Sequence, residues 1–373
     1  MLYYLFQLTD LWHGTAMAKT FHVFQYISFR AMGAGLTAFL ISLFFGKKVI
    51  VRLIQLKIGQ PIRSAEEVHR LNELHGSKQG TPTMGGILLI GSVLLSSLLW
   101  ARPTNPLVWI LLFTATYLGA LGFYDDYLKV TQKKSAGIKS RHKFGLQCLL
   151  ALMVTLFFFL TPSLSAQARE VYFPFLKGPI ITHLGVFSAF IFYLFIIVGT
   201  SNAVNITDGL DGLAAGCTVM AAVTYAVFTY VAGNLKIATY LQIPHNPFSG
   251  ELAVVSMALA GASLGFLWWN CYPARVFMGD TGSLPIGGIL GVLAISCKQE
   301  FSLVIVGGVF VCEIVSVILQ VASFKLTGRR IFKMSPIHHH FELSGWQEST
   351  VTVRFWIMAI MFGIIGLATL KMR

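Results

Sequence analysis

Long apolar stretches separated by short polar ones run through almost the whole chain. A helix that crosses the hydrocarbon core of a bilayer needs about 20 largely apolar residues. Ten stretches approach or exceed this length, at 24–45, 84–101, 106–123, 145–161, 183–204, 212–232, 251–269, 282–297, 301–324 and 353–370. The pattern predicts an all-α, polytopic membrane protein with about ten transmembrane helices. We interpret residues 1–373 as a single integral-membrane domain.

The composition agrees with this class. Charged residues make up 12% of the 373 residues, whereas a soluble domain has about 25%. The five cysteines are odd in number and lack CxxC spacing, so we interpret them as small buried apolar residues and not as a disulfide or zinc framework. The N-terminus has no basic segment or cleavage site, which argues against a cleaved signal peptide. We expect residues 1–22 to form a short interfacial segment.

The net charge of +13 has a pattern along the chain. Eighteen of the 28 basic residues lie in loops that follow odd-numbered spans, and Arg354 lies at the edge of the tenth span, next to the last of these loops. Basic loops of this kind stay in the cytoplasm during insertion. The charge pattern therefore predicts that the odd loops are cytoplasmic and, with ten spans, that both termini are periplasmic. The charge does not indicate binding to nucleic acid.

Two adjacent acids follow the third span. If the helix continues, Lys129 stands four residues after Asp125 and three after Asp126, so all three side chains share one face. Adjacent carboxylates beside a lysine can bind a divalent cation and accept a proton. The simpler alternative is a solvated helix end, which is less favourable for two adjacent acids at a membrane boundary.

The segment after the fifth span places amides and carboxylates at every third position. Asn202, Asn205, Asp208 and Asp211 offer oxygen ligands and hydrogen bonds suited to a uracil or a sugar. The alternative is a polar turn in which Asp211 caps the sixth span. Such a cap explains Asp211 well, but it does not require the other three residues.

A third acidic motif precedes the eighth span. Asp280 stands between two glycines at the expected start of a helix, where backbone N–H groups favour phosphate. Magnesium usually takes one or two carboxylates together with phosphate oxygens of the substrate, so Asp280 is a suitable ligand. Asp280 could instead be only the cap of the eighth span. Asn270 and Phe277 belong to the same loop.

Two further polar segments complete the set. His338, His339 and His340 lie between the last two spans, where histidines near an anion can donate hydrogen bonds or move protons. The run is internal, unlike an expression tag, and no cysteine cluster or HExxH spacing supports a zinc site. Lys78 and Thr83 precede the second span and suit a phosphate contact, although Pro and Gly there also mark an ordinary loop end.

All five segments fall in odd-numbered loops and therefore on one face of the membrane. This shared placement predicts a single interfacial site with acids for a metal, lysines for phosphate and histidines nearby. Glu313 is a lone acid inside the ninth span. We expect it to pair with a neighbouring helix and assign it no catalytic role.

Taken together and in order, these motifs resemble the phospho-N-acetylmuramoyl-pentapeptide-transferase family over nearly the whole chain. The resemblance implies transfer of phospho-MurNAc-pentapeptide from UDP-MurNAc-pentapeptide to undecaprenyl phosphate, which gives lipid I and UMP. It also implies a requirement for Mg²⁺ and a homodimer in the bacterial inner membrane. The histidine segment is more similar to this branch than to the N-acetylhexosamine branch of the superfamily.

The resemblance also implies roles for particular residues. Asp280 would be a magnesium ligand, and Asp125 and Asp126 would act near the lipid phosphate, with Asp125 as the candidate base. Lys78, Thr83 and Lys129 would contact phosphate, and Phe277 would stack near the uracil. His339 and His340 would be essential polar residues, with His338 beside the substrate. The remaining residues would line the nucleotide site: Asn202, Asn205, Asp208 and Asn270.

Three other functions share part of this pattern. The nearest is a UDP-N-acetylhexosamine:polyprenyl-phosphate phosphotransferase, which would accept a different sugar nucleotide. An intramembrane prenyltransferase has two Asp-rich magnesium motifs, but the region around Asp280 contains only one acid. A secondary transporter would place its acids near the bilayer midplane on broken helices, whereas nearly all acids here lie in loops.

Overall fold

Ten long helices form the body of the part of the chain that the structure describes. The computed structural model describes residues 2–12, 21–56, 80–132 and 137–372. The long helices are α2 (Ile27–Gln55), α4 (Gly86–Trp100), α5 (Pro106–Gln132), α6 (Ser140–Leu160), α8 (Val186–Thr207), α9 (Leu213–Gly233), α11 (Leu252–Asn270), α12 (Asp280–Ser296), α14 (Gly308–Thr327) and α16 (Glu348–Ala368). Eight are long and apolar enough to cross a membrane, and α4 and α12 are shorter apolar helices. The predicted all-α, polytopic fold is therefore confirmed, and each predicted span overlaps one of the ten long helices.

Short elements join these helices. They are η1 (Leu2–Trp12), η2 (Val23–Gln25), α7 (Pro162–Ala168), β1 (Val171–Tyr172), β2 (Pro179–Ile181), α10 (Leu235–Leu241), η4 (Ser249–Glu251), α13 (Ser302–Val306), α15 (Ile337–Glu342) and η5 (Thr369–Lys371). The two strands pair antiparallel as a hairpin. The ninth predicted span is divided at Gly307, which separates α13 from α14. The N-terminal η1 lies within the segment expected at the membrane interface, and residues 13–20 of that segment lie outside the described chain.

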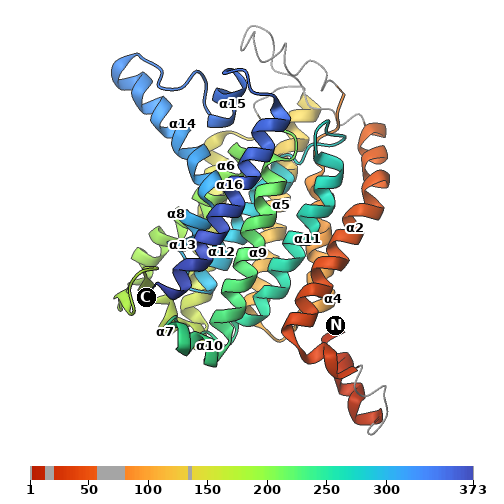
Figure 1. Ribbon diagram of the computed structural model, residues 1–373, viewed down its shortest axis with the longest axis vertical. Coiled ribbons are helices and arrows are strands. Elements are labelled where there is room, and N and C mark those ends of the chain that lie inside the picture. Colours follow the sequence, from red (N-terminus) through yellow and green to blue (C-terminus); the bar gives the residue numbers. More distant parts are fainter. Residues whose placement is uncertain (1, 13–20, 57–79, 133–136, 373) are drawn as a thin grey trace.

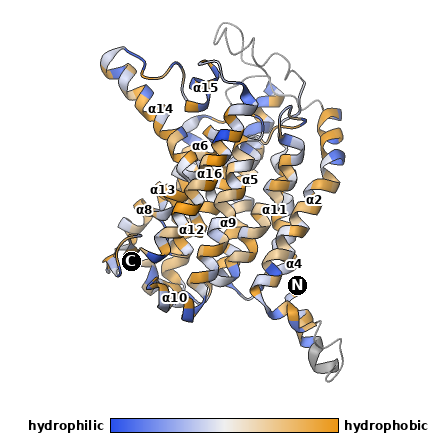
Figure 2. Cartoon of the chain, in the orientation of Figure 1, coloured by the Kyte–Doolittle hydropathy of each residue, from blue (hydrophilic) through white to orange (hydrophobic). Residues whose placement is uncertain are grey.

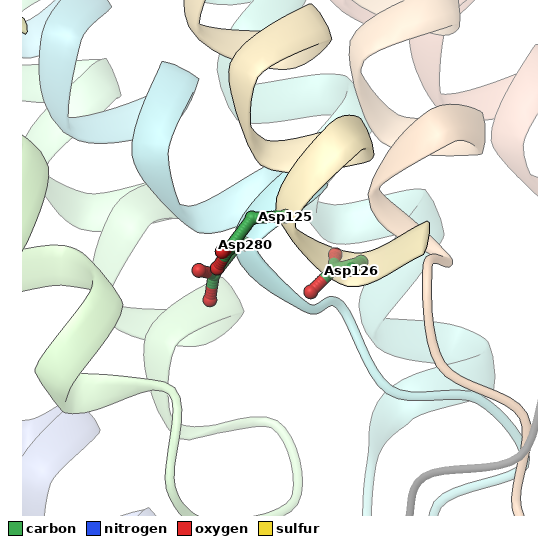
Figure 3. A group of neighbouring side chains, drawn as sticks. All are labelled: Asp125, Asp126 and Asp280. Carbon is green, nitrogen blue, oxygen red and sulfur yellow. The ribbon is translucent and has the colours of Figure 1, made fainter. Parts of the chain in front are cut away.

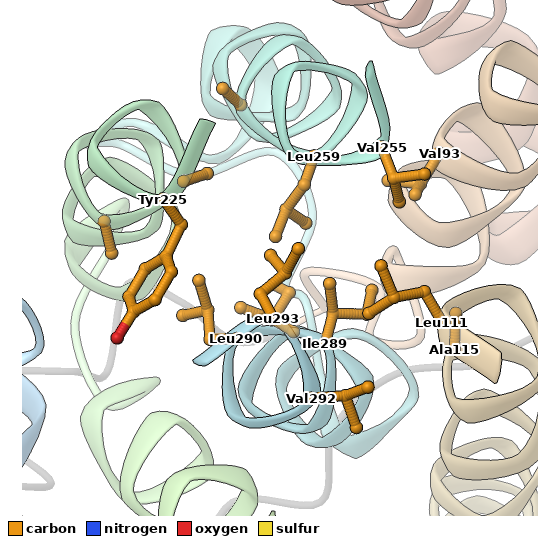
Figure 4. Packing of buried hydrophobic residues seen from close by; sticks show 14 of the residues in the cluster. Val93, Leu111, Ala115, Tyr225, Val255, Leu259, Ile289, Leu290, Val292 and Leu293 are labelled. Atoms are coloured by element: carbon orange, nitrogen blue, oxygen red, sulfur yellow. The ribbon is translucent and has the colours of Figure 1, made fainter. Parts of the chain in front are cut away.

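Helix α12 lies at the centre of the bundle. Every residue from Thr281 to Ser296 is buried, and the helix packs mainly against α5 and α8. Figure 4 shows Ile289, Leu290 and Leu293 of α12 facing side chains from neighbouring helices. A helix that is apolar on all sides belongs in such a central position. Its first residue, Asp280, is therefore held on a rigid support.

Close backbone contact fixes the start of α12 against α5. A Cβ atom at Gly122 would lie only 2.1 Å from the carbonyl oxygen of Asp280. Only glycine allows this approach, which brings the α5 turn carrying Asp125 and Asp126 next to Asp280. The helix contact thus places acids from two distant parts of the chain side by side.

The two ends of the bundle differ in character. Figure 1 shows α15 at one end and both chain termini at the opposite end, as an even number of spans requires. The helices are hydrophobic through the middle of the bundle, while hydrophilic residues gather at its ends and around α15 (Figure 2). The polar motifs therefore lie together at the α15 end.

The structure corrects the expectation that the cysteines are uniformly buried. Cys217 and Cys297 are buried, but Cys271 and Cys312 are exposed and Cys148 is intermediate. Cys271 lies in the loop after α11, and Cys312 lies on α14, where it lines an apolar cavity. All five are free thiols.

Candidate active site

Three carboxylates form the centre of the site. Asp125 and Asp126 come from α5 and Asp280 from α12, and one oxygen of each lies within 4.8 Å of the others. Figure 3 shows Asp125 and Asp280 projecting into the same space, with Asp126 beside them on α5. Asp125 and Asp126 are 3% and 4% exposed, so the alternative of a solvated helix end does not describe them.

Two lysines neutralise part of this negative charge. Lys129 Nζ lies 2.8 Å from Asp125 Oδ2 and 3.1 Å from Asp280 Oδ2. The predicted continuation of α5 is thus confirmed, and it places Lys129 one turn beyond Asp125. Lys143 Nζ, from the first turn of α6, lies 3.4 Å from Asp125 Oδ2 and also bonds Asp280 Oδ2. Three carboxylates and two ammonium groups leave a net negative charge that can accept a divalent cation.

Each acid is also oriented by further hydrogen bonds. Asp125 Oδ1 accepts the backbone N–H of Ile138 at 2.6 Å. Asp126 Oδ2 accepts the backbone N–H and the hydroxyl of Thr281, at 2.9 and 2.7 Å. Asn205 Nδ2 donates to Asp280 Oδ1 at 2.7 Å. The acids are therefore held in fixed orientations, which favours a site that works without rearrangement.

The turn before α12 brings Thr83 and Asp208 to the same place. Gly279 has φ of 71°, a conformation that favours glycine. A Cβ atom there would lie 2.5 Å from Asp126 Oδ2 and 3.0 Å from Thr83 Oγ1. The Asp208 carboxyl group lies near the same turn, and burial together with the Asp280 and Asp126 carboxylates raises its pKa to about 7.

Neither Asp280 nor Asp211 occupies a helix-cap position, although the sequence allowed a cap at each. Gly279 occupies the cap position of α12, so Asp280 is the first residue of the helix. Gly212, with φ of 76°, occupies the cap position of α9, while Asp211 Oδ2 accepts the N–H of Ala274 at 2.9 Å. Asp211 therefore connects two loops of the site and is not a helix cap.

Other candidate residues support the site from its edges. Asn202 Nδ2 donates to Gln147 Oε1 at 3.0 Å, which joins α8 to α6. The side-chain amide of Asn270 accepts the backbone N–H of Gly212 and donates to the backbone carbonyl of Val276. Half-buried Phe277 pairs through its backbone with Pro82 and Gly85. Lys78 lies outside the described residues.

The three histidines are each held by a different partner. His338 Nδ1 lies 3.0 Å from Glu313 Oε2, and His339 Nδ1 lies 2.7 Å from Glu342 Oε2. His340 Nδ1 accepts the backbone N–H of Lys333 at 3.1 Å. The pairing expected for Glu313 is thus confirmed, and its partner is a histidine of the candidate site.

Sequence reasoning did not select Lys143 or Thr281 as site residues. Lys143 was visible as one of the basic residues of the third loop, but its distance from Asp280 along the chain hides their contact. Thr281 directly follows Asp280, and only the fold shows that it binds Asp126. The sequence around Lys143 or Thr281 therefore does not predict either contact.

Comparison with known proteins agrees with this geometry. A family model described as glycosyl transferase family 4 matches residues 108–298, a region that contains all three carboxylates. A phospho-N-acetylmuramoyl-pentapeptide-transferase signature matches residues 78–90. A relative named phospho-N-acetylmuramoyl-pentapeptide-transferase, from Methylacidiphilum infernorum (isolate V4), is 50% identical over 374 residues and covers 100% of both chains.

The chain belongs to the phospho-N-acetylmuramoyl-pentapeptide-transferase family. The family membership agrees with the resemblance seen in its motifs. It also assigns this polytopic chain to the inner membrane of bacteria as a multi-pass protein.

Proposed function

We propose that the chain transfers phospho-MurNAc-pentapeptide from UDP-MurNAc-pentapeptide to undecaprenyl phosphate, in peptidoglycan synthesis. The products are lipid I and UMP. The observation that carries the proposal is the cluster of Asp125, Asp126 and Asp280 with Lys129 and Lys143 at one end of an apolar bundle. One substrate is dissolved in water and the other in lipid, so the reaction needs a charged site at the end of membrane helices.

The donor set of this cluster suits Mg²⁺. Magnesium prefers oxygen ligands and usually keeps one or two protein carboxylates with phosphate oxygens. Asp280 would hold the ion, with Asp125 and Asp126 close enough to take part. When bound, the ion would neutralise charge on the pyrophosphate of the substrate.

The reaction proposed for this site is a single displacement. An oxygen of the lipid phosphate attacks the phosphorus attached to the sugar. The bond from that phosphorus to the bridging oxygen breaks, and UMP leaves with that oxygen. Asp125 accepts the proton of a protonated lipid phosphate, while Lys129 and Lys143 neutralise charge on the phosphate groups.

The surroundings of the histidine segment suit a lipid acceptor. An apolar cavity of about 490 Å³ lies between α14, α15 and α16. Ile337 and Phe341, which line it, flank His338 to His340 on α15. We propose that isoprenoid units of the acceptor occupy this cavity. We also propose that the chain forms a homodimer and that this site lies on its cytoplasmic side.

Competition between donors tests the substrate assignment. Purified protein in detergent, given a polyprenyl phosphate and Mg²⁺, is expected to release UMP from UDP-MurNAc-pentapeptide and not from UDP-GlcNAc. Equal release from UDP-GlcNAc would favour the N-acetylhexosamine phosphotransferase. Transport of substrate into sealed vesicles without UMP release would favour a transporter.

A second experiment tests the single displacement. The rival mechanism forms an aspartyl phosphate before the lipid acts. Incubation with UDP-MurNAc-pentapeptide alone is expected to leave the protein unphosphorylated by mass spectrometry. A phosphorylated Asp125 or Asp126 in that sample would establish the two-step route.

A further inference from the structure

Glu313 is a buried acid with one specific partner. It lies on α14, 25 positions before His338 on α15, and the two side chains are 0% and 1% exposed. An unpaired carboxylate in such surroundings is strongly destabilising, so the partner of Glu313 matters. We assign His338 Nδ1–H as the donor and Glu313 as the acceptor, a pairing that gives the ring one tautomer and one orientation.

The other edge of the His338 ring faces the site. A Cβ atom at Gly209 would lie 2.4 Å from His338 Nε2 and 2.9 Å from its Cε1. Gly209 follows Asp208, whose carboxyl group lies near the carboxylates of Asp280 and Asp126. A continuous series of contacts therefore joins the interior of α14 to the start of α12.

We propose that Glu313 is a positioning residue that acts through His338. By fixing the imidazole against Gly209, it holds the turn after α8 and keeps Asp208 beside the carboxylate cluster. The inference deepens the proposed function, because it gives a role in the reaction to an acid that does not itself belong to the cluster. Partners of this kind commonly affect activity as strongly as the residues they orient.

A double-mutant cycle between Gly209 and His338 tests the contact. Gly209→Ala places a methyl group where the imidazole lies, so it is expected to lower kcat about tenfold or more in the wild-type background. In the His338→Ala background the ring is absent, and the same change should lower kcat less than about threefold. Equal losses in both backgrounds would overturn the proposal.

A second cycle tests the role of Glu313. Glu313→Leu and His338→Ala are each expected to lower kcat about tenfold or more, and the double variant should lose no more than the worse single one. Glu313→Gln keeps an oxygen that accepts from Nδ1–H and should recover most of kcat. Losses that multiply in the double variant, or a Gln variant as poor as Leu, would contradict action through His338.

Glu300 provides a matched control for the removal of a buried acid. It is 3% exposed and pairs with Lys298 at 2.8 Å, beyond the far end of α12. Glu300→Gln should lower the unfolding temperature without changing the kcat penalty of Gly209→Ala. Glu313→Leu frees the His338 ring and should therefore reduce the kcat penalty of Gly209→Ala; if Glu300→Gln reduces that penalty equally, the effect is general and the proposal fails.

The proposed function and this inference fail in different ways. A wild-type chain that releases no UMP contradicts the function only. The Gly209 and Glu313 variants are then compared by unfolding temperature in detergent, where coupled losses support the contact path and additive losses overturn it.

Discussion

Each acid of the carboxylate cluster has its own set of hydrogen-bond and ion-pair partners. Asp280 accepts from Asn205 on one oxygen and meets two lysines on the other. Asp126 accepts the backbone N–H of Thr281, the residue that follows Asp280 on α12. Each acid therefore has a distinct environment, although all three have the same side chain. Such differences separate a metal ligand from a proton acceptor.

Asp280 is the residue on which the metal assignment depends. Asp280→Asn keeps the shape of the side chain but removes its charge, so kcat should fall by about 10²-fold or more. The Mg²⁺ concentration for half-maximal activity should rise. UMP release measured across a magnesium titration checks both outcomes.

Glu170 gives the control for this change. It lies at the far end of the bundle, where its carboxylate accepts from the Tyr172 hydroxyl. Glu170→Gln should leave the magnesium titration unchanged. An Asp280→Asn variant with wild-type magnesium dependence would rule out the ligand role.

Lys143 is one of two site residues that the structure adds, together with Thr281. Lys143→Ala removes an ammonium group from Asp125 and Asp280 and should lower kcat about 10²-fold. Lys139→Ala removes the same charge from an exposed position in the same loop and should have little effect. Steady-state kinetics of both variants separate a specific contact from the general charge of the loop, and equal losses would contradict the specific one.

At the scale of elements, the site depends on the contact between α5 and α12. The Cβ of Gly122→Ala would meet the Asp280 carbonyl oxygen at 2.1 Å. Separating the helices should cost about 1–3 kcal/mol of stability and displace the acids. The unfolding temperature and kcat are therefore both expected to fall.

Gly91 on α4 is the matched glycine. No atom lies within 4 Å of a Cβ placed there, and alanine should stabilise the helix by about 0.5–1 kcal/mol. If Gly122→Ala behaves like Gly91→Ala in both measurements, the close contact does not determine the site.

The elements differ in how well sequence alone could predict them. Hydropathy finds the ten helices because lipid imposes their length, and it places Asp125 and Lys129 on one face through helical periodicity. It misses the division at Gly307, since both halves are apolar. It also misses the pairs Lys143–Asp280 and Glu313–His338, because partners on separate helices are set by packing and not by spacing.

For the whole molecule, the structure shows which polar loops lie together, and the basic residues indicate on which side of the membrane they lie. The chain termini lie opposite the α15 end (Figure 1). Positive loops remain in the cytoplasm, so the carboxylate cluster should face the cytoplasm and both termini the periplasm.

Thiol labelling tests this orientation. Cys271 is exposed beside the site, and Lys177 is exposed in the hairpin at the other end. In chains with a single cysteine, a membrane-impermeant maleimide should label Lys177→Cys in intact spheroplasts and Cys271 only in inverted vesicles. The reverse pattern would place the site in the periplasm.

The most direct test of the central claim counts both products of the reaction. Purified protein with UDP-MurNAc-pentapeptide, undecaprenyl phosphate and Mg²⁺ should form UMP and lipid-linked MurNAc-pentapeptide in equal amounts. Formation of both should require the lipid and should be lost in Asp280→Asn. UMP formed without the lipid-linked product, or neither product formed by the wild-type chain, would contradict the account.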